Sequence, residues 1–126
     1  VAVGGVIHAW ARSNDPNAAV HAERVLCDMQ KRYENGESKV SPDALCCNSV
    51  IHGWCRNGKP EKAEHVLRYM WAMYEANPKL KIKPDRISYK GVIRAWENSS
   101  DPDAASHVKR LMEEQRNCGI FAKTKP

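Results

Sequence analysis

The sequence predicts an all-α fold, a right-handed α-solenoid of about three helix–turn–helix repeats with a period of 42–44 residues. Two observations predict it. Apolar residues and prolines recur along the chain at separations of 44 and then 42 residues. Within each unit the apolar residues follow the i, i+3, i+4, i+7 spacing of a helix. A single two-helix unit cannot cover its own apolar faces, so the units are expected to stack on one another.

The repeat is defined by residues that align without internal gaps. The seam prolines Pro42, Pro84 and Pro126 are 42 residues apart both times. Separations of 44 and then 42 residues relate the members of four other sets: Val6, Val50 and Val92; Trp10, Trp54 and Trp96; Pro16, Pro60 and Pro102; His21, His65 and His107. The chain is therefore expected to be a single helical-repeat region over 1–126, with units 1–43, 44–85 and 86–126. It is expected to be a fragment of a longer chain.

Each unit is predicted to contain two helices. Cys47, Val50, Ile51 and Trp54 form one stripe of the middle unit's first helix, so the tryptophans are expected in the core. A proline is expected to open every second helix, with Asp15 and Asp101 as N-caps. The second helices should end near residues 35–36, 77–78 and 118–119, where asparagine, glycine or proline supplies a stop signal. Substitution of apolar residues by Lys109 and Gln115 predicts a weaker third unit.

Composition narrows the classes of function. The chain has 20 Lys and Arg against 15 Asp and Glu, a net charge of +5, which favours an anionic partner such as nucleic acid. No apolar run approaches the roughly 18 residues of a membrane span, so no membrane association is expected. The five cysteines form no C-x-x-C pair, which argues against zinc and favours small buried thiols.

No catalytic pattern is present in the sequence. There are no clustered carboxylates for metal ions, no paired acid and base at catalytic spacing and no glycine-rich phosphate loop. The recurring histidines lie on second helices with no carboxylate recurring beside them, so a seam or outer-face position is expected for them. The sequence therefore predicts a binding protein with no cofactor, no metal and no enzymatic activity.

The local details identify the type of repeat. Cys55-Arg56-Asn57-Gly58 follows Trp54 where a tetratricopeptide repeat would place a Leu-Gly pair and then a tyrosine. The middle unit, from Cys47 to Lys59, through Ala63 to Met70 and on to Lys83-Pro84-Asp85, resembles the pentatricopeptide repeat family instead. Its segment between Met70 and Pro84 is longer than is usual in that family.

The resemblance implies that single-stranded RNA lies along the first helices, with about one base recognised per repeat. Two side chains per unit would read each base, and in the middle unit these are Asn48 and Asp85, a pair that resembles a uracil-preferring combination. The first unit would offer Gly4 with Asp43, and the third would offer Lys90. Leu45 and Ile87 match the apolar positions that clamp a base from either side.

Phosphate contacts are expected from arginines near the far end of the first helices, namely Arg12, Arg56 and Arg94. The resemblance further implies a monomer that supports RNA processing, stability or translation in the mitochondrion or plastid. A protein–protein interaction scaffold of TPR-like helical repeats remains the alternative function. Salt-sensitive binding that competes with RNA would distinguish the two.

Overall fold

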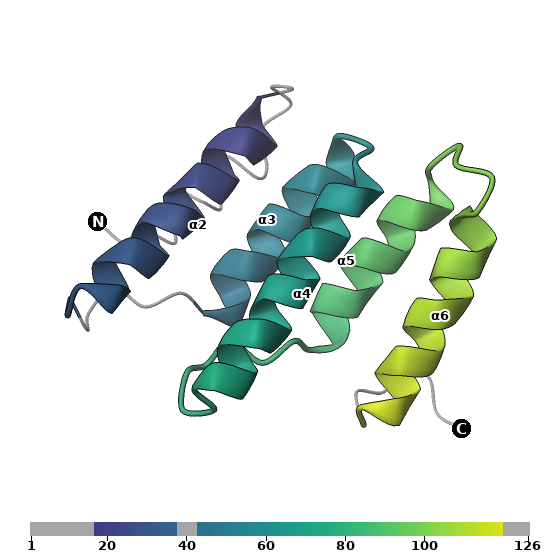
Figure 1. The fold of residues 1–126 in the computed structure, drawn as a ribbon. Helices are drawn as coiled ribbons and strands as arrows, with labels where there is room; N and C mark the ends of the chain where they lie inside the picture. The colour runs from purple at the N-terminus through teal and green to yellow at the C-terminus, as the bar shows by residue number, and fades with distance from the viewer. Residues whose placement is uncertain (1–16, 38–42, 120–126) are drawn as a thin grey trace.

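The computed structural model describes residues 17–37 and 43–119, and these residues form five helices and no strand. Figure 1 shows the helices side by side in chain order. They are α2 (Ala18–Glu34), α3 (Ala44–Arg56), α4 (Pro60–Ala76), α5 (Arg86–Glu97) and α6 (Ala104–Asn117). The predicted all-α fold of stacked two-helix units is confirmed for this part of the chain.

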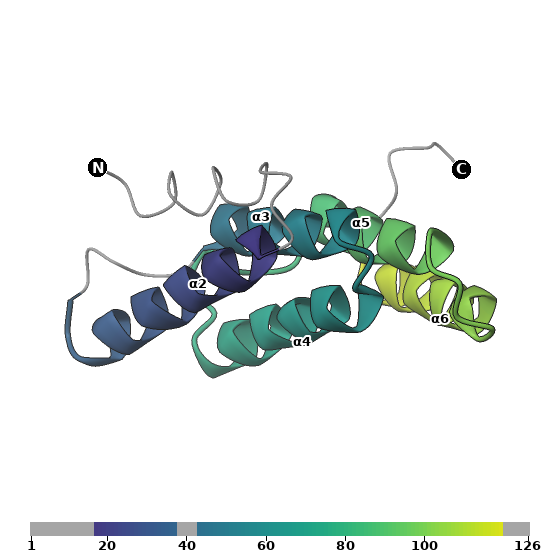
Figure 2. The same ribbon diagram turned by 90° about the horizontal axis from the view of Figure 1, so that it is seen from above.

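The first and second helices of the units form two layers. Figure 2 shows α3 and α5, the first helices of the second and third units, in one layer, and α2, α4 and α6 in the other. Helix α5 packs against α3 and α4 of the preceding unit and against α6 of its own. Each unit therefore covers its neighbour, as a solenoid requires.

The core is built from the predicted apolar stripes. Trp54 and Trp96, on α3 and α5, are only 5% and 3% exposed, so their predicted position in the core is confirmed. The other buried members of the first-helix stripes are Cys47, Val50 and Ile51 on α3 and Tyr89, Val92 and Ile93 on α5. The second-helix stripe of the middle unit is buried as well and consists of Ala63, Val66, Leu67 and Met70.

Each core tryptophan is hydrogen-bonded to a glutamate of the preceding unit. The indole Nε1 of Trp54 donates to Glu23 Oε1 on α2 at 2.8 Å. In the next unit Trp96 Nε1 donates to Glu64 Oε1 on α4 at 3.0 Å. Because a buried indole N–H without an acceptor is costly, this bond holds each first helix to the second helix before it.

Charged side chains join α4 to α6 across the last seam. Arg68 bridges Glu64 at 3.1 Å and Glu114 at 2.6 Å, and Arg110 reaches Glu64 at 3.0 Å. Burial alone would raise the pKa of the Glu64 carboxyl, but hydrogen bonds from Arg110, Trp96 and Arg68 outweigh it and the pKa is lowered. The network therefore stabilises the charged form of Glu64 in the folded state.

The second helices end where the sequence predicts, but the first and the third begin later than expected. Helices α2, α4 and α6 have C-caps Asn35, Asn77 and Cys118, and α4 begins at Pro60 as predicted.

The predictions that Pro102 opens the third unit's second helix and that Asp101 caps it are wrong, because α6 begins at Ala104 with Asp103 as N-cap. The Asp101 carboxylate instead accepts a hydrogen bond from the Asp103 backbone N–H at 2.7 Å, which forms a turn before the helix. Helix α2 likewise begins at Ala18 with Asn17 as N-cap, so the predictions that Pro16 opens it and that Asp15 caps it are wrong as well, although Asp15 and Pro16 themselves lie outside the described residues.

The long segment after Met70 is accommodated by the fold. It lengthens α4 to Ala76 and then returns as a linker whose Ile82 is fully buried. The Lys81 carbonyl accepts a hydrogen bond from the Ala44 backbone N–H at 2.7 Å, at the start of α3. The linker is therefore anchored to the middle unit at both its side chain and its backbone.

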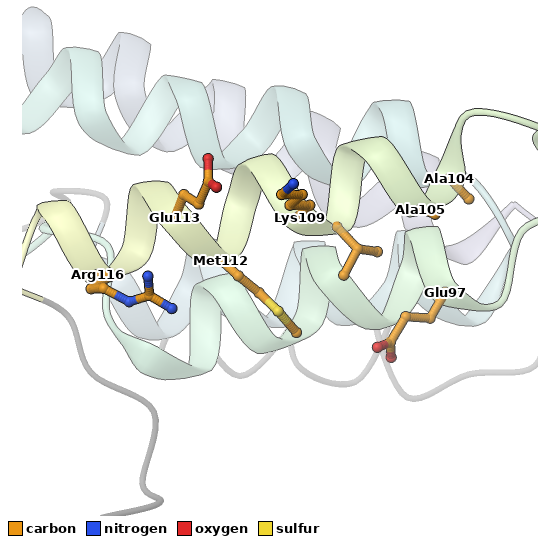
Figure 3. A pocket seen from close by; sticks show the side chains of 8 residues that line it. Glu97, Ala104, Ala105, Lys109, Met112, Glu113 and Arg116 are labelled. Carbon is orange, nitrogen blue, oxygen red and sulfur yellow. The ribbon is translucent and has the colours of Figure 1, made fainter. Parts of the chain in front are cut away.

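One face of α6 is not covered by any described residue. Ala105 and Met112 are exposed and Val108 is partly exposed, although their counterparts 42 residues earlier on α4 are buried. Figure 3 shows the shallow hollow that they form, lined also by Glu97, Ala104, Lys109, Glu113 and Arg116. The third unit consequently buries less apolar surface than the second, although Gln115 is itself buried.

Helix α5 passes close to α3 at Gly91. A Cβ atom added there would lie 2.8 Å from Ile51 Cγ2 on α3. Real Cβ contacts are almost never that short, and Ile51 is 1% exposed, so it has little room to move. The absence of a side chain at Gly91 sets the distance between α3 and α5.

We expect Gly91→Ala to destabilise the chain. Overpacking costs about 1–3 kcal/mol, whereas the gain in helix propensity is about 1 kcal/mol, so the free energy of unfolding should fall. Urea unfolding followed by circular dichroism measures it. In an Ile51→Ala background the methyl group that Gly91→Ala would strike is absent, so there the same change should be neutral or stabilising. Equal destabilisation in both backgrounds would contradict this account of the helix contact.

Candidate nucleic-acid interface

Asn48 and Asp85, 37 residues apart in the chain, lie in contact across the seam between the second and third units. Asn48 is partly exposed on the first half of α3, and Asp85 is the N-cap of α5. The Asn48 amide Nδ2 donates to Asp85 Oδ1 at 3.2 Å. The structure therefore brings together the two side chains that the sequence predicts for the middle unit's base readout.

Asp85 is held in place by the start of the helix that it caps. Its Oδ1 accepts from the Ser88 backbone N–H at 3.0 Å, and the Ser88 hydroxyl oxygen accepts from the Asp85 backbone N–H at 3.1 Å. This reciprocal capping box satisfies two backbone donors of α5. The position of the carboxylate is thus fixed by local backbone structure and does not depend on a ligand.

Two large apolar side chains stand on the outer surface beside this pair. Leu45 of α3 is 70% exposed and Ile87 of α5 is 59% exposed. They occupy equivalent positions 42 residues apart, in the first turn of each helix. Exposed leucine and isoleucine contribute nothing to the core, so their position favours contact with an apolar or aromatic ligand surface.

A basic stripe runs along α5. Arg86, Lys90 and Arg94 follow at intervals of four residues, and all three are exposed. On a helix this spacing aligns side chains on one face. The same stripe of α3, in the same layer (Figure 2), holds Asn48, His52 and Arg56. The outer surface of the first helices therefore combines hydrogen-bonding and positively charged side chains, an arrangement suited to a polyanion.

The other predicted site residues have separate positions. Gly4 and Arg12 lie outside the described residues. Asp43 is the N-cap of α3, where its carboxylate accepts from the Cys46 backbone N–H at 2.9 Å. Burial, assisted by the Asp43 side chain, raises the pKa of the Cys46 thiol to about 12. Asp43 is consequently placed as Asp85 is, with Cys46 in the position that serine takes in the next unit.

Two residues of this site, Arg86 and Ser88, were not predicted from the sequence. Arg86 directly follows Asp85, and its four-residue interval to Lys90 could have been recognised from helical periodicity. Ser88 lies under the Asn48–Asp85 pair and has no exposed surface, and its hydroxyl donates to Asn48 Oδ1 at 2.5 Å. Its capping role was predictable from the Asp-x-x-Ser spacing, but its contact with α3 was not.

Other chemistry-bearing residues lie apart from this surface. Among residues 17–37 and 43–119 no three His, Cys, Asp or Glu side chains are grouped to hold a metal ion, and no helix is long and apolar enough to cross a membrane. His107 stacks on Trp96 of its own unit with ring centroids 3.9 Å apart, so this contact lies within the third unit and not at a seam, while His65 is exposed on the outer face as expected. The prediction of buried thiols holds for Cys46 and Cys47 and is wrong for Cys27 and Cys118, which are exposed at the ends of the stack.

Comparison with known proteins gives one match. Residues 38–71 match the family model described as PPR repeat. The match includes all of α3 and most of α4, so it coincides with the unit that carries Leu45 and Asn48. No curated protein and no solved structure is significantly similar to the chain.

Substitutions of Asp85 can test its role as the N-cap of α5. Asp85→Ala should lower the free energy of unfolding by about 0.5–2 kcal/mol, because α5 loses its N-cap. Asp85→Asn should have little effect, since an amide oxygen can accept the same bond. Thermal unfolding measures both. Asp103→Ala is the matched control, because this N-cap residue makes no side-chain capping bond. A loss in the control equal to that in Asp85→Ala would contradict the assignment.

Proposed function

We propose that this chain binds single-stranded RNA along α3 and α5, because residues 38–71 match a PPR repeat model and the described helices form a stack of two-helix units. The observation that carries the proposal is the Asn48–Asp85 hydrogen bond, flanked by the exposed Leu45 and Ile87. Donor, acceptor and apolar surface are what an unstacked base requires of a protein. No other cluster in the described residues combines the three.

The proposed base at this position is uracil. One Asn48 N–H and Asp85 Oδ2 make no hydrogen bond within the described part of the chain, so a donor and an acceptor are left for the base. The Watson–Crick edge of uracil offers carbonyl oxygens and one N–H, which complement these groups. Leu45 and Ile87 would bury the two faces of the ring. Lys90 would occupy the corresponding position of the third unit, and Gly4 with Asp43 that of the first.

The basic stripe would hold the backbone of the RNA. Arg86, Lys90 and Arg94 supply three positive charges on α5, and Arg56 and Arg12 are the candidates from the preceding units. Contacts to phosphate contribute affinity that is independent of sequence and falls with added salt. Recognition of one base, together with phosphate contacts at several positions, would give modest sequence specificity.

We propose that the protein acts as a monomer in the mitochondrion or plastid. There it would support the processing, stability or translation of the RNA that it binds. This setting is supported by the resemblance alone. A TPR-like protein-binding scaffold is the second candidate. The exposed Leu45 and Ile87 are compatible with this second candidate, because a bound peptide could cover these apolar side chains as a base would. Insensitivity of binding to salt and to competing RNA would identify the scaffold.

We expect the wild-type chain to prefer uracil over the other bases, and Asn48→Ala to abolish the preference. A good base-edge pair contributes discrimination of about 1–3 kcal/mol, or about fivefold and upwards in Kd. Fluorescence anisotropy with short RNAs that differ only in one base measures it. Lys109→Ala, an exposed change on α6, is the control and should bind as the wild type does. A preference that survives Asn48→Ala would exclude this pair as the reader.

Removal of the basic stripe should weaken binding to all RNAs alike. With Arg86→Ala and Arg94→Ala combined, the slope of log Kd against log salt should fall by about 0.7 for each phosphate that the protein no longer neutralises. The relative affinities for the four bases should be retained. An unchanged slope, or a change no larger than that of Lys109→Ala, would show that the phosphates lie elsewhere.

A further inference from the structure

We propose that Ser88 is a positioning residue that fixes the amide of Asn48 in one orientation and thereby sets the base preference of this unit. The inference rests on the proposed function and concerns the same site. Ser88 has no exposed surface, so its hydroxyl would act on a base only through Asn48.

The hydrogen bonds around Ser88 allow one assignment of its proton. The hydroxyl oxygen accepts from the Asp85 backbone N–H, and its single proton has two possible acceptors. Asn48 Oδ1 lies at 2.5 Å and Asp85 Oδ1 at 3.1 Å. Asp85 Oδ1 already accepts from the Ser88 backbone N–H and from Asn48 Nδ2. The proton therefore belongs to the shorter contact, and the Ser88 hydroxyl, the Asn48 amide nitrogen and the two backbone N–H groups then each have an acceptor.

This assignment defines which atoms Asn48 can present outward. Its oxygen is held by Ser88 at one end and its nitrogen by Asp85 at the other. Turning the amide over would place its oxygen against the Asp85 carboxylate, which has no proton to share. Without the Ser88 hydroxyl, only the longer contact of 3.2 Å to Asp85 would restrain the side chain. The amide could then swing and present either a donor or an acceptor to a base.

The preceding seam supports the link between the hydroxyl and the amide. Asp43 and Cys46 stand 42 residues before Asp85 and Ser88, and Asp43 caps α3 as Asp85 caps α5. The readout position there is Gly4, which has no amide to orient, and a thiol replaces the hydroxyl. Capping alone is therefore served by Asp-x-x-Cys in this chain. Of these two seams, only the one that has an asparagine at the readout position has a serine beneath it.

The test uses the whole chain with Ser88→Ala and Ser88→Cys, the second copying the preceding seam. Ser99→Ala is the matched control, because it removes a hydroxyl hydrogen-bonded to the Trp96 carbonyl at the opposite end of α5. Anisotropy should show the affinity ratio of uracil to cytosine falling about fivefold in both Ser88 variants and holding in the control. In an Asn48→Ala background Ser88→Ala should change the ratio no further, which loss of helix stability alone would not produce.

A second measurement needs no RNA. In nuclear magnetic resonance spectra the Asn48 side-chain amide should be rigid and slow to exchange in the wild type and in Ser99→Ala, and mobile in Ser88→Ala and Ser88→Cys. An amide equally rigid in all four proteins would overturn the proposal. A wild type without base preference would refute the proposed function, and the amide measurement would then decide the role of Ser88 by itself. A ratio unchanged in both Ser88 variants beside a selective wild type would overturn the inference alone.

Discussion

The burial of Trp54 and Trp96 constrains the rest of the described fold, because each indole N–H must find an acceptor inside the stack. For Trp54 and Trp96 the acceptor is a glutamate on the preceding second helix. This couples the helices in a fixed order and orients each first helix relative to the unit before it. Glu64 also forms ion pairs with Arg68 on α4 and with Arg110 on α6, so the same glutamate contacts the second helix of the next unit. The apolar stripes supply most of the burial, while these polar bonds select one register among the packings that the stripes alone would permit.

The candidate site lies at the contact between the second and third units, which is also the contact that holds these two units together. Asn48 belongs to the second unit, whereas Asp85 and Ser88 begin the helix of the third. Neither unit holds the site alone, and the close approach at Gly91 determines how near the two helices come. The exposed Leu45 and Ile87 and the basic stripe complete a surface on the outer side of the layer formed by α3 and α5. The stability of this seam and the recognition proposed for it therefore depend on the same contact.

Periodicity was sufficient to predict the helices, their order and the buried apolar stripes of α3, α4 and α5, since a helix that buries one face must repeat apolar residues at its own pitch. Asn48 and Asp85 were paired only through the resemblance to the pentatricopeptide repeat family, and the structure shows the two side chains in contact. The start of α6 was mispredicted because Asp101 uses its carboxylate for a turn, a choice that local propensity does not distinguish from capping. The Ser88–Asn48 bond could not be predicted, because it depends on the separation of two helices and hence on Gly91 and Ile51.

The order of the tryptophan–glutamate bonds has a consequence for how the chain folds as it is made. Each glutamate precedes its tryptophan, by 31 residues for Glu23 and Trp54 and by 32 for Glu64 and Trp96. During synthesis from the N-terminus the acceptor has therefore left the ribosome before the donor appears. Helices α3 and α5 can each dock on a surface that already exists, so growth proceeds by addition at one end. Each of them in turn covers the preceding unit, so an earlier unit of the nascent chain becomes stable once its next neighbour has been made.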